Sequence, residues 1–209
     1  MNQQTSNEIL TILKQIIPNP KCELIYHNTF ELLCAVMISS QTTDKRVNMV
    51  TPQLFLKYPT PLAMSKARYE DVFEIIKSLG FAKTKANHLI EMSKMLHNEF
   101  LDVIPSTIEE LTRLPGVGRK TASVVLVEGF HLPAMPVDTH LERMAKRLGY
   151  ASEKDSVREV EEAYRKYIKE EDWIVSHHLF LLFGRYHCKA MNPQCEGCLL
   201  KKYCKEKKD

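Results

Sequence analysis

Apolar side chains recur along this chain every three or four positions, which is the spacing of one face of a helix. The first stripe runs from Ile9 to Ile17, and Pro18 and Pro20 directly after it predict the end of that helix. No segment alternates apolar and polar residues as a half-buried strand does. The pattern therefore predicts an all-α protein. The same spacing predicts further helices over residues 69–79, 83–100, 138–148, 155–168 and 173–183.

Residues 32–38 differ from these stripes because they are apolar on every side of a predicted helix. A helix start signal at residues 28–31 precedes the run. A helix without a polar face belongs in the middle of a hydrophobic core. Its polar continuation, residues 39–44, is therefore expected to emerge at a surface, and Asp44 is expected to cap the helix that follows.

One segment, Leu-Pro-Gly-Val-Gly-Arg-Lys, predicts two helices joined by a tight turn. The Ser-x-x-Glu pattern that begins at Ser106 predicts the start of a short helix, and Pro115 cannot prolong that helix. Gly116 and Gly118 are expected to occupy backbone regions that are closed to residues with a Cβ atom. A second helix is expected to begin near Arg119. The segment therefore predicts a helix, hairpin, helix unit.

This hairpin suits a phosphate group. The first amides of the second helix have no partner within that helix, and the helix dipole is positive at this end. Backbone amides do not contact base edges, so such a site would position DNA without reading its sequence. The alternative is that the turn only joins two packed helices. The turn alone does not decide between the two interpretations.

Lys120 and Asp138 are the candidate catalytic residues. Lys120 lies in the first turn of the second predicted helix, where the helix dipole and Arg119 both disfavour an ammonium group. Its neutral, nucleophilic form is therefore more accessible. Asp138 offers a matching carboxylate, but it also precedes the helix predicted over 138–148 and is a good N-cap. On local grounds capping suffices to explain it.

Composition limits the classes of protein to consider. A chain of 209 residues with 44% apolar content can bury a substantial core. No segment approaches the roughly 20 consecutive apolar residues of a membrane span, and the N-terminus has no long apolar run. We therefore expect a soluble intracellular protein, located in the cytoplasm, with no membrane partner.

The net charge is only +3, so binding to a polyanion would need a concentration of basic residues. From residue 184 onward seven basic residues stand against three acidic ones. This tail either supports DNA binding or is simply a solvated end. Its basic residues are Arg185, Lys189, Lys201, Lys202, Lys205, Lys207 and Lys208.

Four cysteines close to the C-terminus have the spacing C-x6-C-x2-C-x5-C: Cys188, Cys195, Cys198 and Cys204. Without a signal sequence, a secreted disulfide framework is not expected, and a metal site is the default. Spacing alone permits either tetrahedral zinc or an iron–sulfur cluster. Cys34 lies in the apolar run at 32–38 and is expected to be a core residue.

Taken together and in order, these motifs resemble the endonuclease III branch of the helix-hairpin-helix DNA glycosylases. The resemblance rests on the hairpin segment followed by Val-Asp-Thr-His at 137–140, and it extends over nearly the whole chain. Its other landmarks are residues 30–33, 39–44, 79–81 and 184–188 and the four terminal cysteines.

The resemblance implies a two-lobed fold. A six-helix barrel domain with the hairpin would span residues 22–133, and residues 1–21 and 134–209 would form a cluster domain. The DNA groove would lie between them, with Lys120 and Asp138 facing each other at its mouth. The resemblance also favours a 4Fe-4S cluster on the four cysteines and a monomeric protein.

The implied function is a bifunctional DNA N-glycosylase and abasic-site lyase of base excision repair. It would remove oxidised pyrimidines such as thymine glycol from double-stranded DNA, through a Lys120 Schiff base and β-elimination, with Asp138 stabilising positive charge on the sugar. Gln41 would fill the gap left by the extruded nucleotide, and Phe81 would be the wedge. The DNA contacts would be Gln41, Phe81, Gly116, Val117, Gly118, Arg119 and Lys189.

Purely structural roles are the alternative to these DNA contacts: Phe81 could be a hydrophobic anchor, and Gln41 could simply be a residue at a helix end. Two departures from the family pattern weaken the DNA contacts, namely Ala82 in place of an aromatic residue and a single basic residue within 189–194. An adenine glycosylase of the same superfamily shares the hairpin and the cluster but lacks the catalytic lysine. A non-catalytic DNA-binding protein would need neither Lys120 nor Asp138.

Overall fold

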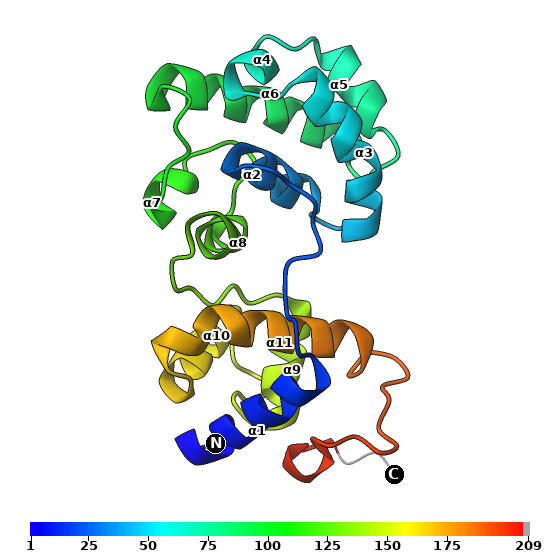
Figure 1. Ribbon diagram of the computed structural model, residues 1–209, viewed down its shortest axis with the longest axis vertical. Helices are drawn as coiled ribbons and strands as arrows, with labels where there is room; N and C mark the ends of the chain where they lie inside the picture. Colours follow the sequence, from blue (N-terminus) through cyan, green and yellow to red (C-terminus); the bar gives the residue numbers. More distant parts are fainter. Residues whose placement is uncertain (207–209) are drawn as a thin grey trace. The chain divides into compact units, whose positions relative to one another are not determined.

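The computed structural model describes residues 1–206, so Lys207 and Lys208 of the basic tail lie outside the described residues. Within this range the secondary structure is entirely helical, as the periodicity predicts (Figure 1). The longer helices are α1 Gln3–Ile16, α2 Thr29–Ile38, α3 Asp44–Lys57, α5 Tyr69–Ile76, α6 Ala82–Phe100, α8 Arg119–Phe130, α9 Thr139–Leu148, α10 Val157–Tyr167 and α11 Trp173–Tyr186. The shorter elements are α4 Pro61–Ser65, α7 Ile108–Leu111, η1 Glu170–Asp172 and η2 Lys201–Tyr203.

The chain divides into two compact units. Residues 23–132 form one, with helices α2 to α8, and residues 1–22 join 133–209 in the other, with α1 and the helices from α9 onward. These borders fall one residue from those expected from the sequence. The arrangement of the 23–132 helices as a six-helix barrel stays a prediction.

Helix α2 is the centre of the 23–132 unit. All residues from Leu32 to Ile38 are buried, which confirms the expectation drawn from the apolar run. Figure 1 shows α2 between α8 and α6, and it packs against both. Helices α4 and α5 cover α6. The polar residues after α2 emerge at the surface, where Gln41 is exposed.

The other unit has its own hydrophobic core. Helix α11 packs against α9 and α1, and α10 packs against α9. The Tyr164 hydroxyl donates a hydrogen bond to the Leu141 carbonyl oxygen at 2.8 Å, and Ser6 and Tyr150 share one at 2.7 Å. Because Ser6 belongs to α1, this core ties the start of the chain to its C-terminal part.

Two of the expected helix caps lie one residue from the positions that the patterns suggest. The Asn28 side chain caps α2 as predicted, but Thr43 rather than Asp44 caps α3, and Thr107 rather than Ser106 caps α7. In both corrected cases a threonine in extended backbone accepts from an N–H three residues on. Asp44 instead becomes the first helical residue, where its charge favours the helix dipole.

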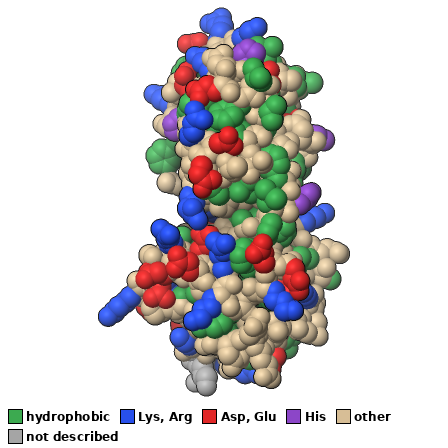
Figure 2. Space-filling model, turned by 90° about the vertical axis from the view of Figure 1, so that its left-hand side faces the viewer, with side chains coloured by type: hydrophobic (Ala, Val, Ile, Leu, Met, Phe, Trp, Pro, Cys, Tyr) green, Lys and Arg blue, Asp and Glu red, His purple; other side chains and the backbone are tan. Residues whose placement is uncertain are grey.

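Helix α4 is absent from the sequence prediction because five residues are too few to show a periodicity. Its signals are local: Thr60 caps it and Pro61 begins it. Over the described part of the chain no helix is long and apolar enough to cross a lipid bilayer. Figure 2 shows acidic and basic side chains interspersed on the visible face, in keeping with the small net charge.

Candidate active site and nucleic-acid interface

The hairpin between α7 and α8 depends on a glycine at position 116. The turn is closed by a hydrogen bond from the Val117 N–H to the Leu114 carbonyl at 3.0 Å. Gly116 has a φ of 79°, in the left-handed region, and a Cβ built on it would lie 2.7 Å from Nδ1 of His88 on α6. Both the backbone conformation and the close approach of α6 therefore require glycine here.

Gly118 corrects the sequence expectation. Its φ of −88° and ψ of 173° are open to any residue, so it does not occupy a region reserved for glycine. It is the N-cap residue of α8, and no atom lies within 4 Å of a Cβ built on it. What glycine contributes at this position is open space and the lack of a capping side chain at the start of α8.

The residues predicted to contact DNA at the hairpin do not all face solvent. Gly116, Gly118 and Arg119 are exposed, whereas the Val117 side chain is buried and its N–H is used within the turn. Lys120, the second residue of α8, is exposed. The structure thus presents the candidate nucleophile at the surface, directly beside the hairpin.

Gln41 and Phe81, predicted as gap filler and wedge, lie in adjacent loops. Both have left-handed backbone, with φ values of 53° and 58°. A Cβ built on Gly80 would lie 3.8 Å from the Gln41 carbonyl oxygen, which brings the two loops together. Phe81 is 66% exposed, so it does not act as a hydrophobic anchor. An exposed aromatic side chain beside an exposed glutamine is the arrangement that the DNA roles require.

Lys85 is a residue that sequence reasoning missed at this place. It is buried in the first turn of α6, and its ammonium group donates to the Ser40 carbonyl and to the Thr42 hydroxyl. Burial, together with the charge of Arg46, lowers the pKa of this ammonium group. The available signal was its place on the apolar face of α6, between Ala82 and Leu89.

Asp138 is the N-cap of α9, as its position predicts. One of its carboxylate oxygens accepts from the backbone N–H groups of His140 and Leu141, at 2.9 Å each. The side chain is half-buried. Burial lowers the pKa of the neighbouring His140, while the Asp138 charge opposes that shift and the Arg143 charge adds to it.

The four terminal cysteines line one cavity of about 40 Å³, together with Phe183 and Pro193. Burial raises the pKa values of the Cys198 and Cys204 thiols, and the charge of Cys188 raises both further. Among residues 1–206, no three or more His, Cys, Asp or Glu side chains converge closely enough to hold a single metal ion. The four thiols thus border one cavity but do not converge on a single point within it.

Two arginines of α9 hold the start of the cysteine loop, and sequence reasoning missed both. Arg143 donates to the carbonyl oxygens of Gly184 at 2.7 Å and Cys188 at 3.0 Å. Arg147 is 7% exposed and donates to the Lys189 carbonyl at 2.8 Å, with its Nη1 also 3.3 Å from Cys188 Sγ. The Lys189 side chain itself is exposed, as its predicted DNA role requires.

The predicted site residues belong to two different units. The 23–132 unit holds Gln41, Phe81, the hairpin and Lys120, and the other unit holds Asp138, Lys189 and the four cysteines. In the first unit Gln41 lies beside the Phe81 loop and Lys120 lies beside the hairpin, and in the second the four cysteines line one cavity.

Comparison with known proteins identifies the family. Residues 34–170 match the model of the HhH-GPD superfamily of base excision DNA repair proteins. Endonuclease III of Bacillus subtilis (strain 168) is 46% identical over 191 residues, which are 91% of this chain and 87% of that protein. Endonuclease III of Escherichia coli (strain K12) is 40% identical over 211 residues, covering 100% of both chains.

A solved structure gives the same answer. The structure of a trapped covalent intermediate between endonuclease III and DNA, an estranged-adenine complex, superposes with a TM-score of 0.95 at 43% identity. The match covers 99% of this chain and 97% of that one. The chain therefore belongs to the endonuclease III family of DNA glycosylase/lyases, within the HhH-GPD superfamily of base excision repair proteins.

Proposed function

We propose that this protein removes oxidised pyrimidines from double-stranded DNA and then cuts the strand at the abasic site, using Lys120 as its nucleophile. The observation that carries this proposal is the exposed Lys120 in the first turn of α8. It lies next to the hairpin, and the N-cap residue of α8 is a glycine, Gly118. A lysine at the positive end of a helix is poorly placed for stability, and a nucleophilic role accounts for it.

DNA binding would begin at the hairpin. Gly118 leaves space over the start of α8, so a phosphate group can approach the backbone amides and the helix dipole. The exposed Arg119 adds a positive charge there, and Lys189 adds another from the cysteine loop. These contacts involve the DNA backbone, so binding would be independent of sequence and sensitive to salt.

Base extrusion would follow. The damaged base must leave the helical stack before its C1′ atom can be attacked. The exposed Phe81 ring would enter the stack as a wedge, and Gln41 would fill the space left opposite the partner base. For the related endonuclease III, the trapped complex has an estranged adenine, which supports gap filling by this family.

In the chemical step Lys120 Nζ attacks C1′, and the bond from C1′ to the base breaks with the base taking the electron pair and a proton. The lysine loses a proton and the sugar ring opens, which leaves a Schiff base. Removal of a proton from C2′ then breaks the C3′–O bond and expels the 3′ phosphate, which cuts the strand. The covalent intermediate trapped for the related endonuclease III supports this route.

Asp138 would act as an ionised carboxylate. One of its oxygens accepts from the α9 amides, and the negative charge of the carboxylate would stabilise positive charge on the sugar and help proton transfer. The capping bonds fix the orientation of the carboxylate. Capping and catalysis are therefore compatible roles for this residue.

Members of the endonuclease III family generally carry a 4Fe-4S cluster, and Cys188, Cys195, Cys198 and Cys204 would hold it here. Four thiols around one cavity are a suitable ligand set, and its volume of about 40 Å³ is larger than a single water molecule needs. The cluster would supply structural cross-linking of the loop from Cys188 to Cys204. Arg147 would help to hold the sulfur of Cys188 in place, since its Nη1 donates to that sulfur at 3.3 Å.

This proposal includes the remaining expectations. Residues 22–133 would form the hairpin-bearing barrel domain, and residues 1–21 and 134–209 the cluster domain. The protein would act as a monomer on chromosomal DNA in the cytoplasm, with no membrane partner.

Borohydride trapping tests the proposal. A duplex with one thymine glycol is incubated with wild type, K120A or K66A, and borohydride then reduces any Schiff base to a stable adduct. Lys66 is an exposed lysine of the same unit and serves as the control. Wild type and K66A should give an adduct that maps to Lys120, and K120A should give none while still binding DNA.

Base release without an adduct by wild type would instead indicate a monofunctional glycosylase that uses water. Binding without release or adduct, on both thymine glycol and abasic-site duplexes, would indicate a non-catalytic DNA-binding protein.

A further inference from the structure

We infer that Lys85 is a positioning residue that ties the gap-filling loop to the wedge, so that Gln41 and Phe81 enter the DNA as one rigid unit. This inference rests on the proposed function, because it presupposes that both side chains contact DNA. It assigns a role to a buried lysine whose ammonium group donates to residues 40 and 42.

Lys85 is buried to an unusual degree for a lysine, with 5% of its surface exposed. A buried ammonium group is costly unless hydrogen bonds replace its water shell. Two such bonds are made: Nζ donates to the Ser40 carbonyl oxygen at 2.8 Å and to the Thr42 hydroxyl at 3.0 Å. If the loop moved, the buried ammonium group would lose both hydrogen-bond acceptors. The cost of burying it unpaired therefore holds the loop in this position.

The two acceptors flank Gln41 on either side along the chain. Gln41 itself has a φ of 53°, a left-handed conformation that a residue with a side chain adopts rarely. Such a conformation persists where surrounding contacts fix it. Anchoring of residues 40 and 42 by a single ammonium group supplies such contacts, and it holds the Gln41 side chain at the surface.

The backbone of Lys85 holds the wedge at the same time. Its N–H donates to the Phe81 carbonyl at 3.0 Å, which closes the first turn of α6. Phe81 is the left-handed N-cap residue of that helix and has no side-chain cap of its own. A second tether joins α3 to the loop that precedes Phe81, because the Arg46 guanidinium donates to the Ser78 carbonyl. One residue, Lys85, thus contacts both Phe81 and the residues around Gln41.

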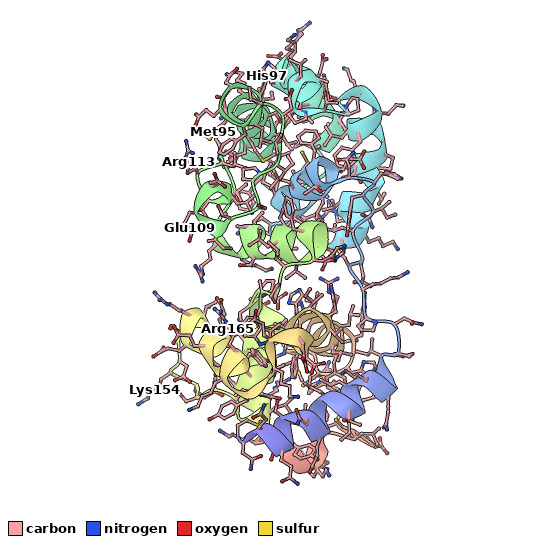
Figure 3. All side chains as sticks on the ribbon, turned by 60° about the vertical axis from the view of Figure 1, so that its left-hand side comes forward. Met95, His97, Glu109, Arg113, Lys154 and Arg165 are labelled. Carbon is pink, nitrogen blue, oxygen red and sulfur yellow. The ribbon has the colours of Figure 1, made fainter. Side chains whose placement is uncertain are left out.

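Helix α6 also supports the hairpin, but through other residues. His88 packs beneath Gly116, and Arg113, labelled in Figure 3, pairs with Glu99 at 2.5 Å and lies over the Phe100 ring. Loss of the Lys85 ammonium group should therefore loosen gap filling and leave the hairpin in place. The expected defect is in nucleotide extrusion and not in phosphate binding.

The experiment compares wild type, K85M and K94M on two abasic-site duplexes. Lys94 is an exposed lysine of the same helix, paired with Glu91, and is the matched control. In one duplex adenine stands opposite the abasic site, and in the other the opposite nucleotide is also abasic. The chemistry at the sugar is identical, but only the first duplex has an opposing base whose space must be filled. Strand cleavage is measured under single-turnover conditions.

K85M should cut the adenine duplex about tenfold or more slowly than wild type and should cut the doubly abasic duplex at close to the wild-type rate. K94M should match wild type on both. 2-Aminopurine beside the abasic site should brighten less with K85M than with wild type, since less unstacking occurs. T42V, which removes one of the two acceptors, should give a smaller defect of the same kind and controls for misfolding of K85M.

An equal loss on both duplexes, or a K85M rate equal to that of K94M on the adenine duplex, would overturn the inference. If wild type cuts neither duplex, the proposed function fails instead, so the two failures are distinguishable.

Discussion

Asp138 shows how one side chain can serve the fold and the chemistry together. Its carboxylate caps α9 through two backbone N–H groups, and its charge is what the proposed mechanism uses. Asparagine is about as good an N-cap as aspartate but carries no charge, whereas alanine can do neither. The two roles can therefore be separated by substitution at this position.

We expect D138N to keep the wild-type stability and to lose base release by about 100-fold or more. D138A should lose the same activity and in addition about 1 kcal/mol of unfolding free energy, because the α9 amides lose their cap. Thermal melts and single-turnover base release measure the two effects. Full activity of a well-folded D138N would remove Asp138 from the mechanism and leave it a capping residue.

The residues that could be predicted from sequence are those whose chemistry is set by local context. Asp138 as a cap and Cys34 in the core are confirmed because a helix start and an apolar run are local patterns. Lys85 and Arg147 could not be assigned, because each acts on carbonyl oxygens of segments about 40 residues away along the chain. Only the tertiary structure shows which carbonyls lie near a buried cation.

At the scale of elements, the periodicity of apolar residues predicts where a helix forms more reliably than it predicts the residue at which the helix begins or ends. The apolar stripes predicted the long helices, but the α3 and α7 caps lie one residue from the expected positions, because a neighbouring threonine had the extended backbone that a cap needs. The hairpin was predicted correctly, but the expectation that Gly118 needs a backbone conformation reserved for glycine was wrong. Gly116 is constrained by its backbone and by His88, and Gly118 by neither.

This difference makes the two glycines a matched pair for testing the hairpin. G116A should lower the unfolding free energy by roughly 1–2 kcal/mol for the left-handed backbone alone, with more lost through the clash with His88. G118A should change stability by less than about 0.5 kcal/mol, since its Cβ meets open space. If a phosphate approaches the start of α8, that methyl group should nevertheless weaken DNA binding.

Thermal melts give the stability changes, and fluorescence anisotropy with an undamaged duplex at two salt concentrations gives the affinities. Wild-type affinity in a stable G118A would contradict phosphate binding at the hairpin.

At the scale of the whole molecule, the chain builds two separate cores, one from residues 23–132 and one from the two ends of the chain. In the second unit Leu200 is buried, and Cys188, Cys198 and Tyr203 pack against the core. The loop that carries the thiols therefore packs against the hydrophobic core of that unit through these residues. Loss of the ligand set should disturb this core and leave the other one intact.

We accordingly expect C198S to lose the visible absorption of an iron–sulfur protein and to expose the segment around residues 188–204, since its thiols would no longer be cross-linked. Cys22 is half-buried in the same unit and does not line the cavity, so C22S is the control and should stay coloured.

Hydrogen exchange measured by mass spectrometry should show faster exchange in 188–204 and in α9, whose Arg143 and Arg147 hold that loop. Exchange in α2 and α6 should be unchanged, because these helices belong to the other core. A colourless C198S with wild-type protection throughout would show that the four cysteines do not hold a structural cluster.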